Sequence, residues 1–138
     1  EPEWDPIYDF ADQRGLTIIA HTDEDPKNLP KHLAEIAPRY PTANFVAAHS
    51  GNTAEPRSQA IAAARTHPNV YLGTCSTFRT PGVIEQLVNQ AGADRVIFGS
   101  DLGLLDPRSQ LGKIITADIS DEAKRKILGG NANRLLGI

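Results

Sequence analysis

Four short apolar runs recur along the chain at nearly even intervals. They start at residues 16, 44, 69 and 95 and occupy residues 16–20, 44–48, 69–73 and 95–99. Apolar residues follow one another within each run and alternate only weakly with polar ones. Strands that are buried on both faces have this pattern, and such strands are typical of parallel sheets. The runs therefore predict four strands of one parallel sheet.

Segments with helical periodicity separate these runs. Before the first run, Trp4, Ile7, Phe10 and Ala11 form an apolar stripe that ends at Gly15. Helices tend to begin at Ser or Thr and to end at Gly or before Pro. These signals predict helices over residues 29–40, 56–67, 80–91, 120–128 and 131–136, and a long loop over residues 102–111. A strand followed by a helix at this spacing requires right-handed crossovers, so the sequence predicts a parallel β/α fold.

Length and composition limit the possible protein classes. The chain has 138 residues, 40% of them hydrophobic and 22% charged, which is typical of one modest globular domain. It is too short for a complete eight-fold β/α barrel, which needs about 200 residues or more. Its formal net charge of −3 argues against a nucleic-acid partner. No run of about 20 apolar residues occurs, so no membrane span is expected.

The only cysteine is Cys75, which excludes an intrachain disulfide and a cysteine zinc cluster. A single cysteine fits a reducing environment, and we expect a cytoplasmic protein. No signal peptide is visible. The sequence opens at Glu1 inside a predicted helix. This opening indicates a cut or incomplete chain, so residues 1–138 are expected to form a single, partial domain.

Polar side chains follow each predicted strand at the same register. His21 follows the first run, His49 the second, Cys75 and Ser76 the third, and Asp101 the fourth. In parallel β/α sheets the carboxyl ends of the strands form the active-site face. We therefore expect these side chains to lie close together although they are distant in sequence.

Histidine and aspartate at one edge are the ligand types that suit a divalent metal, zinc first and manganese second. Such a metal lowers the pKa of a bound water or polarises a substrate oxygen. Asp101 could ligate the metal and take the proton of that water, while His49 could orient the water or polarise the scissile group. The alternative is that each His is a structural hydrogen-bonding residue and that Asp101 caps the following loop.

Four segments carry a resemblance to a known family. They are His-Ser-Gly at 49–51, Asn-Val-Tyr-Leu at 69–72, Gly-Ala-Asp-Arg-Val-Ile-Phe-Gly-Ser-Asp at 92–101 and Asn-Ala-Asn-Arg-Leu-Leu at 131–136. Together they resemble the amidohydrolase-related family, which contains metal-dependent hydrolases, lactonases and decarboxylases of the aminocarboxymuconate-semialdehyde type. The resemblance covers essentially the whole chain.

The family fold is a distorted eight-fold β/α barrel of the TIM type. By this resemblance, the chain is an α/β protein whose four strands match strands five to eight, a parallel (β/α)4 half of that barrel. His21 then matches a metal ligand, His49 a residue that acts on the water or substrate, and Asp101 a metal ligand and proton shuttle. The resemblance implies a divalent metal cofactor and a small-molecule substrate.

The sequence also departs from the family pattern. The family's first strand carries a His-x-His pair that supplies two ligands, and no His-x-His occurs here. The Gly-Gly that often follows the strand-six His is Gly51-Asn52, and the Pro often found after the strand-eight Asp is absent at Leu102 and Gly103. The chain alone is therefore short of metal ligands.

Other candidate residues have two interpretations each. Cys75 could be a nucleophile beside His49, or a small buried side chain at a strand end. Arg79, with Ser76 near it, could bind a substrate carboxylate, because a guanidinium forms bidentate contacts with carboxylates. A solvated loop arginine is the alternative for Arg79, and the same two interpretations apply to Arg108.

Three functional hypotheses follow. The first is a metal-dependent hydrolase that activates water at a mononuclear metal to cleave a small carbonyl or carboxylate substrate. The second is a metal-dependent decarboxylase of the same family. The third is a non-catalytic half-barrel, whose partner is the missing N-terminal half or a second copy that closes an eight-stranded barrel, because exposed strand edges invite pairing. A doubly wound three-layer fold is the less favoured architecture.

Overall fold

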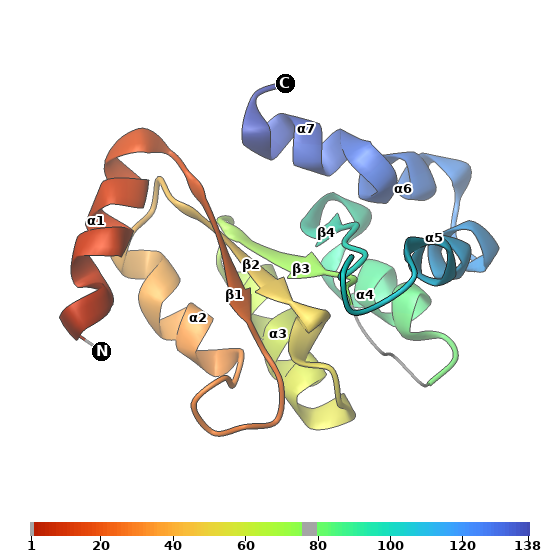
Figure 1. Ribbon diagram of the computed structural model, residues 1–138, viewed down its shortest axis with the longest axis horizontal. Coiled ribbons are helices and arrows are strands. Elements are labelled where there is room, and N and C mark those ends of the chain that lie inside the picture. Colours follow the sequence, from red (N-terminus) through yellow and green to blue (C-terminus); the bar gives the residue numbers. More distant parts are fainter. Residues whose placement is uncertain (1, 76–79) are drawn as a thin grey trace.

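The computed structural model describes residues 2–75 and 80–138. Four strands form one parallel sheet in the order β1-β2-β3-β4, with β1 at Thr17–His21, β2 at Asn44–Ala48, β3 at Val70–Gly73 and β4 at Val96–Ile97 (Figure 1). The order of the strands in the sheet is their order in the chain. Each connection therefore moves one strand further across the sheet, as the regular repeat of the sequence predicts.

Helices connect the strands and cover one face of the sheet (Figure 1). The elements before β3 are η1 Pro2–Trp4, α1 Asp5–Arg14, α2 Lys31–Ile36, η2 Ala37–Arg39, η3 His49–Gly51 and α3 Ala54–Thr66. Those after β3 are α4 Val83–Ala91, η4 Ala93–Arg95, α5 Pro107–Thr116, α6 Asp121–Arg125, the π-helical η5 Lys126–Gly130 and α7 Asn131–Leu136. The largest fully buried apolar side chains of the core are Phe45, Leu72, Leu87, Ile114 and Ile127. No helix among the described residues is long and apolar enough to cross a membrane.

Two helix starts differ from the sequence-based expectation. Helix α4 begins at Val83 after Gly82, whose φ of 80° places it in the left-handed region, so Thr80 is not its N-cap. Helix α5 begins at Pro107, inside the segment predicted as a long loop. The Asp106 side chain accepts a 2.9 Å hydrogen bond from the Arg108 amide there, which is an N-cap that the apolar pattern does not reveal.

The C-terminal helix also continues where the sequence predicts an end. Gly129 and Gly130 lie in the π-helical turn η5, which joins α6 to α7. In this turn the Asn131 amide donates to the Lys126 carbonyl, and the Ile127 carbonyl instead accepts a 2.9 Å hydrogen bond from the Phe98 amide. The wider turn therefore releases one carbonyl to hold the chain just after β4. β4 itself is shorter than the predicted run over residues 95–99.

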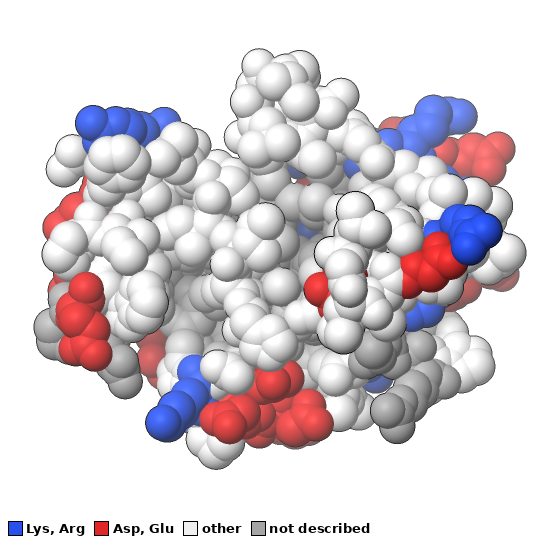
Figure 2. Space-filling view, viewed as in Figure 1, with Lys and Arg blue, Asp and Glu red and all other residues white. Residues whose placement is uncertain are grey.

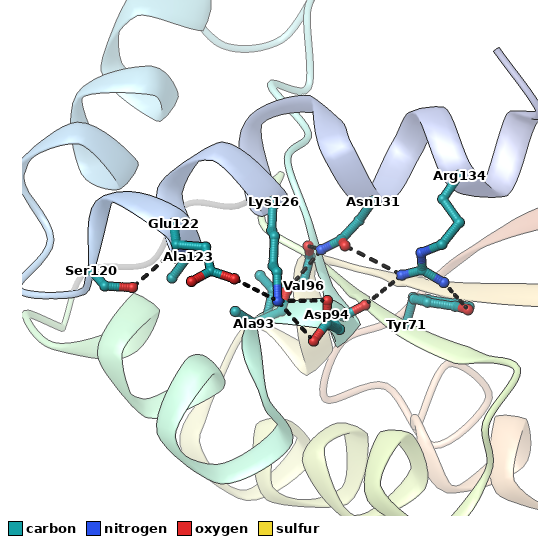
Figure 3. Close-up of polar contacts among 10 residues, drawn as sticks. All are labelled: Tyr71, Ala93, Asp94, Val96, Ser120, Glu122, Ala123, Lys126, Asn131 and Arg134. Carbon is teal, nitrogen blue, oxygen red and sulfur yellow. Dashed lines mark hydrogen bonds and ion pairs between the residues drawn. The ribbon is translucent and has the colours of Figure 1, made fainter.

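The C-terminal segment is fixed to β4 by polar side chains (Figure 3). Asn131 is 2% exposed, and its side-chain amide donates to the carbonyls of Ala93 at 2.7 Å and Val96 at 2.8 Å. Arg134 donates to the Asp94 carbonyl at 3.0 Å and to the Asn131 side-chain oxygen at 3.3 Å. Asn131 is the first residue of α7, as predicted, and its side chain anchors that helix to the sheet.

The two edges of the sheet are consequently unlike each other. The Ile97 carbonyl accepts from Thr74 of the β3 side at 3.0 Å, so Val96 and Phe98 direct their backbone groups to the other side. There the side chain of Asn131 and the carbonyl of Ile127 contact them. The expectation of exposed strand edges is therefore wrong for β4, whose outer edge is covered by the chain's own C-terminal segment. In the described part of the chain, β1 has a strand neighbour on one side only.

Candidate functional site at the carboxyl ends of the strands

Two histidines meet where β1 and β2 end. His21 is the last residue of β1 and is in register with Ala48, so His49 follows directly on the neighbouring strand. The two imidazole rings are in edge-to-face contact, with centroids 4.7 Å apart and planes at 68°. The structure therefore brings together the first two residues that the strand-end register predicts, although they are 28 positions apart in sequence (49 − 21 = 28).

Backbone strain is concentrated at the same edge. The non-glycine residues with positive φ in the described chain are His49 at 65°, Ser50 at 45°, Asn52 at 62° and Asp101 at 58°. All four follow β2 or β4. Such conformations cost roughly 1–3 kcal/mol each and occur mostly at functional sites, where surrounding contacts hold them. The strain is therefore located where the candidate side chains are.

Gly51 makes this conformation possible. Its φ is 81°, and a Cβ built on it would lie 2.4 Å from the Pro56 carbonyl carbon. The chain after β2 thus turns so tightly against the start of α3 that no side chain fits at this position. His49 can leave the end of β2 and face His21 only because residue 51 is glycine.

The ring nitrogens of His21 and His49 have different hydrogen-bond partners. The Nδ1 of His49 contacts the Cys75 backbone carbonyl, and since a carbonyl only accepts, Nδ1 carries the proton. In the neutral ring, Nε2 of His49 is then the free acceptor. The Nε2 of His21 lies 2.9 Å from Oδ2 of Asp23. The hydrogen bond to His21 lowers the pKa of Asp23, with a further contribution from the Asp25 amide.

Asp23 is a site residue that the sequence reasoning missed. The strand-end register selects His21 itself, and Asp23 lies two residues beyond it. Its spacing is the signal that could have found it, because a short acidic side chain in a turn can reach back to the residue two positions earlier. The carboxylate orients the His21 ring at the edge of the sheet.

Asp101 lies at the same edge, after β4. Its carbonyl accepts hydrogen bonds from the amides of Leu104 at 3.1 Å and Leu105 at 3.0 Å, which fix the loop behind it. Burial raises the pKa of the Cys75 thiol, and the negative charge of Asp101 raises it further. A raised thiol pKa disfavours the thiolate, and His49 contacts the backbone of Cys75, so these observations favour the buried structural interpretation of Cys75.

The histidine and aspartate side chains at this edge supply only some of the ligands that a metal site needs. In the described ranges no group of three His, Cys, Asp or Glu side chains is close enough together to hold a metal ion. His21 and Asp101 have the ligand chemistry that zinc or manganese requires, but the rest of a coordination shell would have to come from elsewhere. This shortage agrees with the missing His-x-His pair.

Three other candidates were predicted from the sequence. Ser76 and Arg79, predicted to bind substrate, lie outside the described residues. Arg108 is paired with Asp106 at 2.6 Å and its side chain is almost fully exposed, which favours the solvated interpretation.

An apolar hollow of about 230 Å³ lies on the second face of the sheet. Thr17, Ile19, Val46, Ile97 and Leu135 are among the residues that line it. Ile19 in the middle of β1 is 72% exposed. Figure 2 shows that uncharged residues cover most of the middle of this view and that charged residues gather mainly at its rim.

Comparisons with known proteins agree with this architecture. A family model described as amidohydrolase matches residues 1–138. No curated protein matches the chain significantly. An uncharacterized TIM-barrel protein from Bordetella bronchiseptica is 28% identical with a TM-score of 0.79, and the match covers 97% of this chain and 50% of that one.

Two decarboxylases share the fold at lower identity. The 5-carboxyvanillate decarboxylase from Sphingomonas paucimobilis is 16% identical with a TM-score of 0.74, covering 100% of this chain and 54% of that one. A dihydroxybenzoic acid decarboxylase from Polaromonas, solved with bound manganese, is 17% identical with a TM-score of 0.73, covering 99% and 54%. The chain thus spans about half the length of these structures, and its four parallel strands form half of a TIM-type barrel.

Proposed function

This chain belongs to the amidohydrolase family, and we propose that it supplies half of the active site of a metal-dependent hydrolase that cleaves a small carbonyl or carboxylate substrate with activated water. The edge-to-face contact of His21 and His49, at the edge where Asp101 also lies, carries this proposal. Histidine and aspartate at the carboxyl ends of barrel strands are the residues from which such sites are built.

Each residue has a distinct role in this proposal. His21 and Asp101 would hold a zinc or manganese ion together with donors from the other half of the barrel, and Asp23 fixes the His21 ring. A bound divalent ion supplies Lewis-acid polarisation and makes a neighbouring water acidic. Asp101 would accept the proton of the attacking water and return it to the leaving group. The free Nε2 of His49 orients the water or hydrogen-bonds the substrate oxygen.

A metal-dependent decarboxylase is the second candidate. It is favoured by the decarboxylases that share the fold, one of which was solved with manganese. In that reaction the carbon–carbon bond to the carboxylate breaks and carbon dioxide leaves, while an acid protonates the carbon that remains. Asp101 would deliver that proton, so the same three side chains serve both reactions.

The test replaces Asp101 by Asn in a protein that contains both halves of the barrel. Turnover of small lactones and carboxylates should fall by orders of magnitude while the fold stays intact, because the amide neither ligates a metal well nor takes a proton. The matched control is Asp106→Asn, an N-cap away from the strand ends that should keep near-normal turnover. Near-normal turnover of Asp101→Asn would exclude the role proposed for Asp101.

Metal content supplies an independent measurement. We expect about one zinc or manganese ion per barrel after dialysis without chelator, and its loss in His21→Ala. A metal content that is the same in His21→Ala would remove His21 from the ligand set. The chain alone should bind less than one ion, because the described residues contain no group of three ligands.

We also infer that the β1 edge docks the other half of the barrel. Exposed apolar side chains occur on both elements at this end of the chain: Trp4, Ile7 and Phe10 at or before α1 are about half-exposed, and Leu16 and Ile19 at β1 are exposed as well. The related structures are about twice as long as this chain, so the occupant is a second four-stranded β/α half. Light scattering of the isolated chain should show association or poor solubility, and a freely soluble monomer would contradict this inference.

A further inference from the structure

Three buried or half-buried hydroxyl groups link the carboxyl ends of neighbouring strands. Each belongs to the first or second residue after its strand: Thr22 after β1, Ser50 after β2 and Thr74 after β3. Each makes a hydrogen bond to the end of the next strand in the sheet. The three bonds together run across the whole edge that carries His21, His49 and Asp101.

Thr22 makes the most specific of these links. Its hydroxyl donates to the Ala48 carbonyl at 2.6 Å and accepts from the Gly51 amide at 2.9 Å. Ala48 and Gly51 lie on either side of His49 and Ser50, which have positive φ. Thr22 is 2% exposed, so water cannot replace the hydroxyl easily. One side chain just after β1 thus holds both ends of the strained turn that carries His49.

Ser50 and Thr74 continue the series. Ser50 is fully buried and its hydroxyl donates to the Gly73 carbonyl at 2.8 Å, which fixes the turn after β2 to the end of β3. The Thr74 hydroxyl accepts from the Gly99 amide at 3.2 Å, which fixes the end of β3 to the segment that leads to Asp101. The turn of His49 is therefore held from both neighbouring strands.

We propose that Thr22 is a positioning residue that keeps His49 against His21, with Ser50 supporting it from the other side. This inference rests on the proposed function. Thr22 and Ser50 lie outside the residues proposed to react, and they keep His49 in place beside His21. The strained turn could relax without the hydroxyl, because this one group is bonded to both Ala48 and Gly51, at the two ends of the turn. The His49 ring would then leave His21.

The chain contains a matched control nearby. Thr17 is the first residue of β1, and its hydroxyl is buried and has no hydrogen-bond partner in the described structure. Removing a hydroxyl that makes two bonds leaves a carbonyl and an amide unsatisfied, whereas removing one without a partner leaves nothing unsatisfied. Thr22→Val and Thr17→Val therefore make the same chemical change with opposite expectations.

The experiment measures the contact between the histidine rings by nuclear Overhauser effects in the protein that contains both halves of the barrel, without metal or substrate. We expect the cross-peaks between His21 and His49 to be lost in Thr22→Val, kept in Thr22→Ser and unchanged in Thr17→Val. A merely structural role would lower the melting temperature of Thr22→Val and leave the cross-peaks in place. Retention of the cross-peaks in Thr22→Val would overturn the inference.

Ser50→Ala is the second variant, for the case that Thr22→Val does not fold. It removes one hydrogen bond instead of two, and we expect the same loss of cross-peaks, while unchanged cross-peaks count against the inference. The readout needs no turnover. A barrel without hydrolase or decarboxylase activity whose cross-peaks depend on Thr22 would therefore contradict only the proposed function.

Discussion

The two ends of the sheet are built from different chemistry. At the amino ends, the side-chain amide of Asn69 donates to the carbonyls of Ala37, Tyr40 and Ala43 at 2.9–3.1 Å, and Asn131 makes the equivalent contacts before β4. Both amides are buried and their partners are backbone groups. At the carboxyl ends, the polar side chains are imidazoles, hydroxyls and a carboxylate on strained backbone.

This difference separates stability from chemistry. An amide that satisfies two or three buried carbonyls contributes to folding and has no proton to exchange near neutral pH. Imidazole and carboxylate groups exchange protons, and holding them on strained backbone costs stability. In β/α barrels the amino face is typically devoted to stability and the carboxyl face to catalysis, and the half-barrel already shows this division.

The strongest way to break the carboxyl end is Gly51→Ala. The added Cβ would lie 2.4 Å from the Pro56 carbonyl carbon at a φ of 81°. We expect a loss of about 3 kcal/mol or more in the free energy of unfolding, measured by urea denaturation, together with loss of the His21–His49 cross-peaks.

Gly112→Ala is the matched control for this change. Gly112 lies inside α5, and a Cβ there meets nothing within 4 Å. Because alanine favours helix more than glycine does, this variant should be more stable than the parent by up to about 1 kcal/mol. Equal effects of the two substitutions would show that the turn after β2 is not strained.

Asn131→Ala tests the amino end of the sheet, where we expect a loss of stability without loss of the contact between the histidines. It leaves the carbonyls of Ala93 and Val96 without their side-chain donor, so we expect a loss of about 2–3 kcal/mol in the free energy of unfolding. The His21–His49 cross-peaks should persist, because these contacts lie at the other end of the sheet.

The exposed Asn133 on the same helix supplies the comparison for Asn131. Asn133→Ala should change the free energy of unfolding by no more than about 0.5 kcal/mol. If the histidine cross-peaks disappeared in a folded Asn131→Ala variant, the two ends of the sheet would not be separable.

The smallest expected effect concerns the start of α6. The Ser120 hydroxyl accepts a 3.2 Å hydrogen bond from the Ala123 amide, so Ser120→Ala should cost about 1 kcal/mol in thermal unfolding. Thr53 precedes α3 but makes no side-chain capping bond, so Thr53→Ala should cost clearly less. A reversed order would mean that the Ser120 cap does not contribute to stability.

Much of the fold could be predicted from the sequence because it depends on local pattern. The four strands lie where the apolar runs place them, β2 to the residue, and Ser120 caps α6 as predicted. Where the prediction fails, the structure contains hydrogen bonds that the apolar pattern does not show. The start of α5 is capped by the side chain of Asp106. The segment after β4 and the turn at Gly129 and Gly130 are joined by the bond from Phe98 to Ile127, which are distant in sequence.

The sequence by itself determined that a polar or metal-ligating side chain follows each strand, because the order of residues fixes how far each polar residue lies from the end of its apolar run. Only the tertiary structure decided that His21 and His49 touch, and that Thr22 and Ser50 hold the turn of His49. These contacts depend on the parallel pairing of strands more than 20 residues apart in the chain. A linear pattern can place a residue at the end of a strand, but its neighbours across the sheet are fixed only when the strands pair.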